Sequence, residues 1–85
     1  MKEDLANLST DLRRISYWLY QNRVNLAKSF LVRCRKTYRQ INPKIGHYDD
    51  IWAEVEKIDN LEGGLIKASE RALTASLILL HHAQR

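Results

Sequence analysis

Apolar residues recur every three or four positions along the first half of the chain. They are Leu5, Leu8, Leu12, Ile15, Leu19, Leu26, Phe30, Cys34, Tyr38 and Ile41. This spacing matches the 3.6-residue period of an α-helix and not the alternation of a β-strand. The one polar position on this stripe is Arg23, and the polar residues 21–23 indicate a weak point or kink. We therefore predict one long helix over residues 3–41.

A second helical stripe covers residues 49–83. Its members are Ile51, Val55, Ile58, Glu62, Leu65, Ser69, Ala72 or Leu73, Ser76 and Leu80. Gly63 and Gly64 interrupt it, and each glycine costs about 1 kcal/mol relative to alanine inside a helix. Because the stripe keeps its phase across the glycines, we favour a kinked, collinear helix, interrupted near residues 60–64. A true break at this point, which would give three helices, is the alternative.

Turn-forming residues separate the two stripes at residues 42–47. Pro43 has no N–H and disfavours a helical conformation of Asn42, and Gly46 permits a reversal of the chain. Asp49 and Asp50 can then cap the next helix. The sequence therefore predicts an all-α fold, an antiparallel hairpin of two long helices that forms a single domain over residues 1–85.

Each apolar stripe contains one charged residue, and the two charges have opposite signs. They are Arg23 in the first stripe and Glu62 in the second. If the turn centres near residues 44 and 45, partners across the hairpin have numbers that add to about 89. This register brings Glu62 to within about one turn of Arg23. A pair of this kind can fix register even where desolvation cancels its attraction. We predict a buried polar layer formed by Arg23 and Glu62.

Several large apolar residues have no partner in the predicted hairpin. Residues 77–80 surround nearly the whole helix circumference, and a single neighbouring helix cannot cover both sides. A third helix or a second subunit must therefore cover the other side. We expect a homodimer that completes a four-helix bundle, since one patch can meet itself. Alternatively, the hairpin is wider and these side chains belong to its core. The predicted interface residues are Tyr17, Trp18, Trp52, Leu77, Ile78 and Leu79.

Charge is divided unevenly along this chain of net charge +4. Residues 23–44 contain seven Lys or Arg and no acid, whereas residues 49–62 contain six acids and one lysine. Basic residues with interleaved aromatics are typical of phosphate and base contacts. The favoured interpretation is that the hairpin places the two segments side by side and cancels much of the charge. The candidate anion or nucleic-acid face comprises Arg14, Lys28, Arg35, Lys36 and Arg39.

Motifs for catalysis or for a cofactor are missing from the sequence. It contains no Gly-rich phosphate loop, nucleophile elbow or Cys/His pair. Cys34 is the only cysteine, and His81 and His82 point about 100° apart on a helix, so we expect no metal site. We predict a small non-enzymatic interaction or regulatory module that acts through protein–protein contacts, with an unidentified protein as a further partner. A basic nucleic-acid-binding helical protein is the alternative.

Membrane and export signals are not visible in the sequence. The longest apolar run, residues 77–80, is far shorter than the roughly 20 residues that a membrane span needs. The first residues include Lys2, Glu3 and Asp4 and lack an apolar leader. With a single cysteine in the chain, we expect a soluble cytoplasmic protein.

Overall fold

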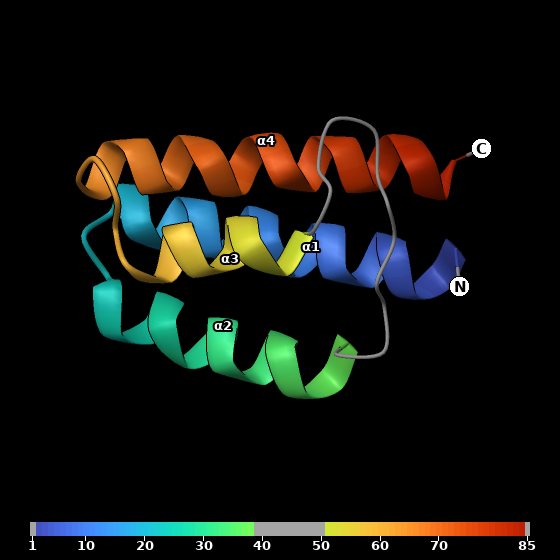
Figure 1. Cartoon of the computed structure of the whole chain (residues 1–85), viewed down its shortest axis with the longest axis horizontal. Coiled ribbons are helices and arrows are strands. Elements are labelled where there is room, and N and C mark those ends of the chain that lie inside the picture. Colours follow the sequence, from blue (N-terminus) through green and yellow to red (C-terminus); the bar gives the residue numbers. More distant parts are fainter. Residues whose placement is uncertain (1, 39–50, 85) are drawn as a thin grey trace.

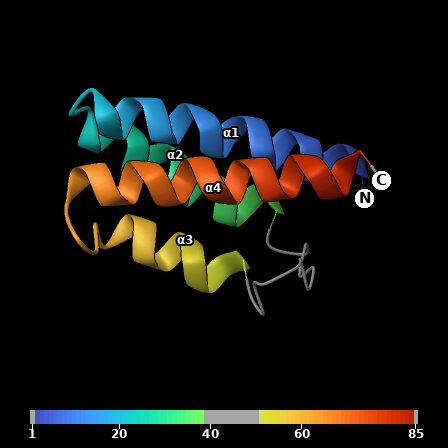
Figure 2. The same ribbon diagram turned by 90° about the horizontal axis from the view of Figure 1, so that it is seen from above.

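The computed structural model describes residues 2–38 and 51–84, which form four α-helices and no strand (Figure 1). These are α1 (Lys2–Tyr20), α2 (Val24–Tyr38), α3 (Ile51–Asp59) and α4 (Leu65–Ala83). Helix α1 packs against α2 and α4, and α3 packs against the same two helices. Figure 2 shows α4 lying between α1 and α3. The all-α prediction is confirmed for these residues, and four helices of one chain pack together as a bundle.

The first predicted long helix is two helices, because the chain reverses at residues 21–23. Asn22 adopts a left-handed conformation with φ 63°. Its N–H bonds to the carbonyl of Leu19, and the N–H of Arg23 bonds to the carbonyl of Trp18 at 2.7 Å. This is the Schellman pattern, and asparagine is among the residues that best tolerate its left-handed position. The weak point that the sequence indicates is therefore a complete turn, and a continuous helix over residues 3–41 is wrong.

The second predicted long helix is also divided, at the place where the glycines interrupt its stripe. The N–H of Leu61, at φ 53°, bonds to the carbonyl of Ile58 and repeats the same helix-ending pattern. Gly63 and Gly64 follow with φ values of 81° and 98°, which disfavour other residues. The preference for a collinear helix is wrong. Helices that fold back around a short turn can face one core, so a continuous phase does not exclude a reversal.

The predicted buried polar layer is wrong as well. Arg23 and Glu62 both lie in the turns between helices, and both are exposed. The turns carry these residues off the helix faces from which their burial was inferred. The predicted connection at residues 42–47, the caps Asp49 and Asp50, and Arg39 lie outside the described residues.

The core follows the predicted stripe in α1 and α3, follows it in part in α4, and departs from it in α2. Leu5, Leu8, Leu12, Ile15 and Leu19 of α1 are buried, as are Ile51, Val55 and Ile58 of α3. In α2 the buried residues are Ala27, Leu31 and Cys34, whereas Leu26 is 38% exposed. The turn at Asn22 resets the phase, so the core positions at the start of α2 are one residue later than the continuous helix predicted.

The contact between α1 and α4 is built from buried serines and alanines. Ser16 Oγ donates to the carbonyl of Ser69 at 2.8 Å, and Ser69 Oγ donates to the carbonyl of Ser16 at 2.9 Å. Seven residues away on each helix, Ser9 Oγ donates to the carbonyl of Ser76 at 2.6 Å. Small side chains let two helix backbones approach closely, and here the hydroxyls bond directly to the opposite backbone.

Candidate functional sites

The outer face of the α1–α4 pair carries the largest exposed apolar side chains of the described residues. On α4 these are Ile66, Leu73 and Leu77, which are 65%, 38% and 56% exposed. Ile66 and Leu73 lie three or four residues from the buried serines, and Leu77 lies four residues after Leu73, so all three are next to the seam with α1. On α1, Tyr17 and Tyr20 are 57% and 73% exposed. We call these five residues the α1–α4 face.

Two opposite charges lie at the middle of the α1–α4 face. The serine pairs fix an antiparallel register in which residue numbers on α1 and α4 add to 85. Arg13 is then level with Ala72, and Glu70 is level with Ile15, about 3 Å away along the helix axis. Both charged side chains are exposed, and neither forms an ion pair with another described residue.

The six predicted interface residues do not share one surface. Tyr17 and Leu77 are exposed on the α1–α4 face. Leu79 is fully buried, and Ile78 is half-buried against the core. Trp18 packs against the ring of Phe30 in α2, with centroids 4.5 Å apart, and Trp52 packs against the core from α3. Trp18, Trp52 and Ile78 are thus half-buried and Leu79 is fully buried, so these four residues do not form one exposed patch with Tyr17 and Leu77.

The predicted basic face is divided as well. Arg14 lies on α1 beside α2, where Arg33 faces it across a pocket. Arg35 and Lys28 are roughly 200° around α2 from Arg33 and therefore lie on its other edge. Lys36 is exposed between these two edges. The four described members of the predicted face are thus distributed around α2 rather than gathered on one surface.

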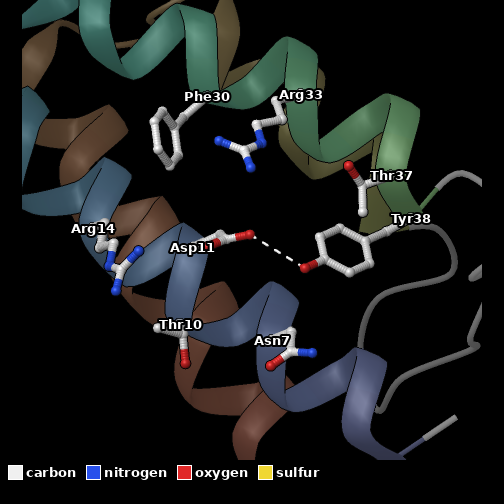
Figure 3. A pocket seen from close by; sticks show the side chains of 8 residues that line it. All are labelled: Asn7, Thr10, Asp11, Arg14, Phe30, Arg33, Thr37 and Tyr38. Carbon is white, nitrogen blue, oxygen red and sulfur yellow. Dashed lines mark hydrogen bonds between the residues drawn. The ribbon is translucent and has the colours of Figure 1, made fainter.

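A pocket of about 340 Å³ opens between α1 and α2 (Figure 3). Its lining comprises Asn7, Thr10, Asp11 and Arg14 of α1 and Phe30, Arg33, Thr37 and Tyr38 of α2. The side chain of Arg33 reaches from α2 toward α1, and its guanidinium carbon lies 5.6 Å from the centre of the Phe30 ring. Guanidinium groups stack well on aromatic rings, so Phe30 helps to orient Arg33.

One carboxylate, that of Asp11, lies among these cations. Tyr38 Oη donates a hydrogen bond to Asp11 Oδ2 at 3.3 Å, and Cys34 Sγ lies 4.0 Å from the same oxygen. Burial, followed by the nearby Asp11 charge, raises the pKa of the Cys34 thiol to about 12. The same two causes raise the pKa of Tyr38. Both groups therefore stay protonated near neutral pH and serve as donors that hold Asp11 in place.

Sequence reasoning missed Asp11 and Arg33. Asp11 and Arg33 become neighbours only because the chain reverses at Asn22, and a continuous helix would separate them by about 33 Å. The exposed apolar residues of α4, by contrast, could have been found from their spacing in the sequence. Ile66, Leu73 and Leu77 are spaced by seven and four, which is a second apolar stripe beside the core stripe of α4.

No known protein family, curated protein or solved structure matches this chain. Among the described helices, none is both long and apolar enough to cross a membrane. Within residues 2–38 and 51–84, no group of three or more His, Cys, Asp or Glu side chains is placed to hold a metal ion.

Proposed function

We propose that this protein is a small, non-enzymatic, cytoplasmic interaction module that self-associates through the α1–α4 face. The observation that carries the proposal is the exposure of Ile66, Leu77 and Tyr20, at 65%, 56% and 73%, on one side of a helix pair. Several large exposed apolar side chains on one face of a small domain are typical of an interaction site. A homodimer would leave the remaining faces available for a further protein partner.

The charges of the α1–α4 face favour a second copy of the chain as its occupant. A two-fold axis parallel to the helices places α1 of one copy opposite α4 of the other at the same height. Arg13 of each copy then faces Glu70 of its partner, so two complementary ion pairs flank the axis. Helices α1 and α4 of both copies then form a four-helix bundle in which neighbouring helices are antiparallel, a common arrangement.

The solution mass tests self-association directly. We expect light scattering across a concentration series to give about 20 kDa, twice the chain mass of 10.0 kDa. Leu77→Glu places a charge within the face and should shift the protein to the monomer. Val32→Glu is the matched control, because Val32 is 52% exposed on α2, away from the face. A monomeric wild-type protein at high concentration, or equal effects of both variants, would contradict the proposal.

A charge swap tests the orientation of the two copies. Arg13→Glu and Glu70→Arg should each weaken the dimer, because each variant brings like charges together. Each exposed pair is worth up to about 1 kcal/mol, so the loss of two symmetric pairs should raise the dissociation constant by up to about thirtyfold. The combined variant restores opposite charges and should recover the wild-type dissociation constant. Additive losses in the combined variant would rule out this arrangement.

Nucleic-acid binding is the second proposal, and the structure gives it less support. Its cations are distributed around α2, so few of them can contact one phosphate backbone together. Fluorescence anisotropy with mixed oligonucleotides at low salt tests it. Binding that weakens steeply with salt, and that is reduced in Lys36→Gln, would favour nucleic acid. The absence of binding at low salt would exclude it.

A further inference from the structure

The pocket between α1 and α2 combines unpaired cations with one fixed carboxylate. No described acid lies within ion-pair distance of Arg14 or Arg33, although Asp11 lines the same pocket. Figure 3 shows the side chains of Arg33 and Asp11 extending into the space between α1 and α2. Arginine presents a planar fork of N–H donors that matches the oxygens of a carboxylate or a phosphate. An anionic group of a ligand would therefore find two cationic partners here.

The carboxylate of Asp11 favours a ligand that also carries a positive or hydrogen-bond-donating group. Tyr38 and Cys34 contact one carboxylate oxygen, Oδ2, which leaves Oδ1 for a ligand. A ligand that carried only negative charge would meet this carboxylate as well as the guanidiniums, and like charges repel at short range. Two cations and one anion on the protein are complemented by two negative charges and one ammonium on the ligand.

We propose that this pocket binds a small acidic zwitterion, whose anionic groups contact Arg14 and Arg33 and whose ammonium contacts Asp11. The volume of about 340 Å³ is at the lower end of the range for ligand pockets and suits a molecule of amino-acid size. Thr10, Thr37 and Asn7 supply neutral donors and acceptors around the opening. The anionic part is either carboxylate or phosphate, since arginine recognises both.

A deletion series of probes tests the charge requirement. The two complete probes are L-glutamate and O-phosphoethanolamine, each with an anionic part and an ammonium. Glutarate lacks the ammonium of glutamate, and 4-aminobutyrate lacks its α-carboxylate. We expect saturable NMR shifts of amides around the pocket with a complete probe, and about tenfold weaker binding of each deletion probe. The tighter of the complete probes identifies the anion.

Matched variants test the residues. Arg33→Gln should weaken the best probe about tenfold, whereas Arg35→Gln, on the other edge of the same helix, should leave it unchanged. Asp11→Asn keeps an oxygen to accept from Tyr38 but removes the charge, so it should erase the preference for glutamate over glutarate. Circular dichroism melting checks that each variant folds.

Three outcomes would overturn the inference. The first is the absence of saturable shifts with both complete probes at concentrations of tens of millimolar. The second is glutarate binding as tightly as glutamate, which would show that Asp11 makes no contact with an ammonium. The third is equal weakening by Arg33→Gln and Arg35→Gln, which would show a general response to net charge. None of these results depends on whether the protein dimerises.

Discussion

Helix α1 contacts α4 through small side chains and contacts α2 through large ones. Along the edge that faces α4, serines bond directly to the opposite backbone, as at Ser16 and Ser69. Along the edge that faces α2, the rings of Trp18 and Phe30 meet at one end, with planes 71° apart. Further along the same edge the contact opens into the polar pocket around Asp11.

The size of the side chains explains this difference and its two consequences. Helix separation depends on the side chains at the contact. Serine and alanine occupy the contact between α1 and α4, and larger residues such as Leu77 and Tyr20 lie beside it on the outside. Large rings separate α1 from α2, and short side chains such as Thr10 and Thr37 do not fill the remaining space. A close seam thus produces an exposed apolar face, and a wide seam produces a pocket.

The largest expected effect concerns Cys34, which lies beneath the wide seam. The raised pKa of about 12, against 9.0 for an unperturbed thiol, lowers the thiolate fraction at pH 8 about a thousandfold. Alkylation by iodoacetamide, followed by mass spectrometry, should therefore be about a thousandfold slower in the native protein than in urea. Comparable rates in both states would mean that the wide seam is open to water down to the thiol.

The same pKa shift predicts how stability depends on pH. The folded-state pKa of Cys34 lies above the unfolded value, so the folded protein retains a proton that the unfolded chain loses. The stabilisation is complete below about pH 9 and is lost as the pH rises toward 12. Urea unfolding should show this decline for the wild type and a smaller decline for Cys34→Ala. Parallel curves would show that other groups, Tyr38 among them, cause it.

The next largest effect compares two hydroxyl residues of α1, one on each edge. Ser16→Leu inserts a large side chain where Oγ lies 2.8 Å from an opposite carbonyl, so we expect a loss of about 3 kcal/mol in the free energy of unfolding. Thr10→Leu extends an exposed residue at the pocket and should change the free energy by less than about 0.5 kcal/mol. Urea unfolding measures both. Equal losses would contradict the assignment of a close and a wide seam.

Much of the helical content could be predicted from the sequence, because apolar spacing reports which side of a helix faces a core. The stripe from Leu5 to Leu19 is buried as expected. The reversals at Asn22 and Leu61 could not be derived from apolar spacing, since each depends on one residue in a left-handed conformation. Leucine at such a position has no sequence signal, because its side chain normally disfavours it.

The candidate sites were less predictable than the core because they depend on which helices are neighbours. Residue numbers of paired positions on α1 and α4 add to 85, whereas the predicted hairpin of two long helices had a register of about 89. It also treated Trp18 as exposed, because no second helix was expected to fold back onto that side of α1. The pocket around Asp11 and Arg33 forms only because the reversal at Asn22 packs α2 against α1.

The smallest expected effect isolates the hydrogen bonds of the close seam. Ser16→Ala and Ser69→Ala each remove one donor to the opposite backbone and should cost about 1 kcal/mol. Their hydroxyl oxygens lie 3.1 Å apart, so the two losses should not be additive. Urea unfolding of both single variants and the double variant should give a coupling energy of at least about 0.5 kcal/mol.

Ser29→Ala provides the matched control for this cycle. Ser29 Oγ also donates to a backbone carbonyl, that of Asn25 at 3.0 Å, but it does so on the exposed side of α2 and within its own helix. Water can replace this hydrogen bond, and alanine has the higher helix propensity, so Ser29→Ala should be neutral or slightly stabilising. If Ser29→Ala costs as much as Ser16→Ala, the cost reflects the loss of any serine hydroxyl. A cost confined to Ser16 and Ser69 would instead show that the hydroxyls contribute through the close approach of α1 to α4.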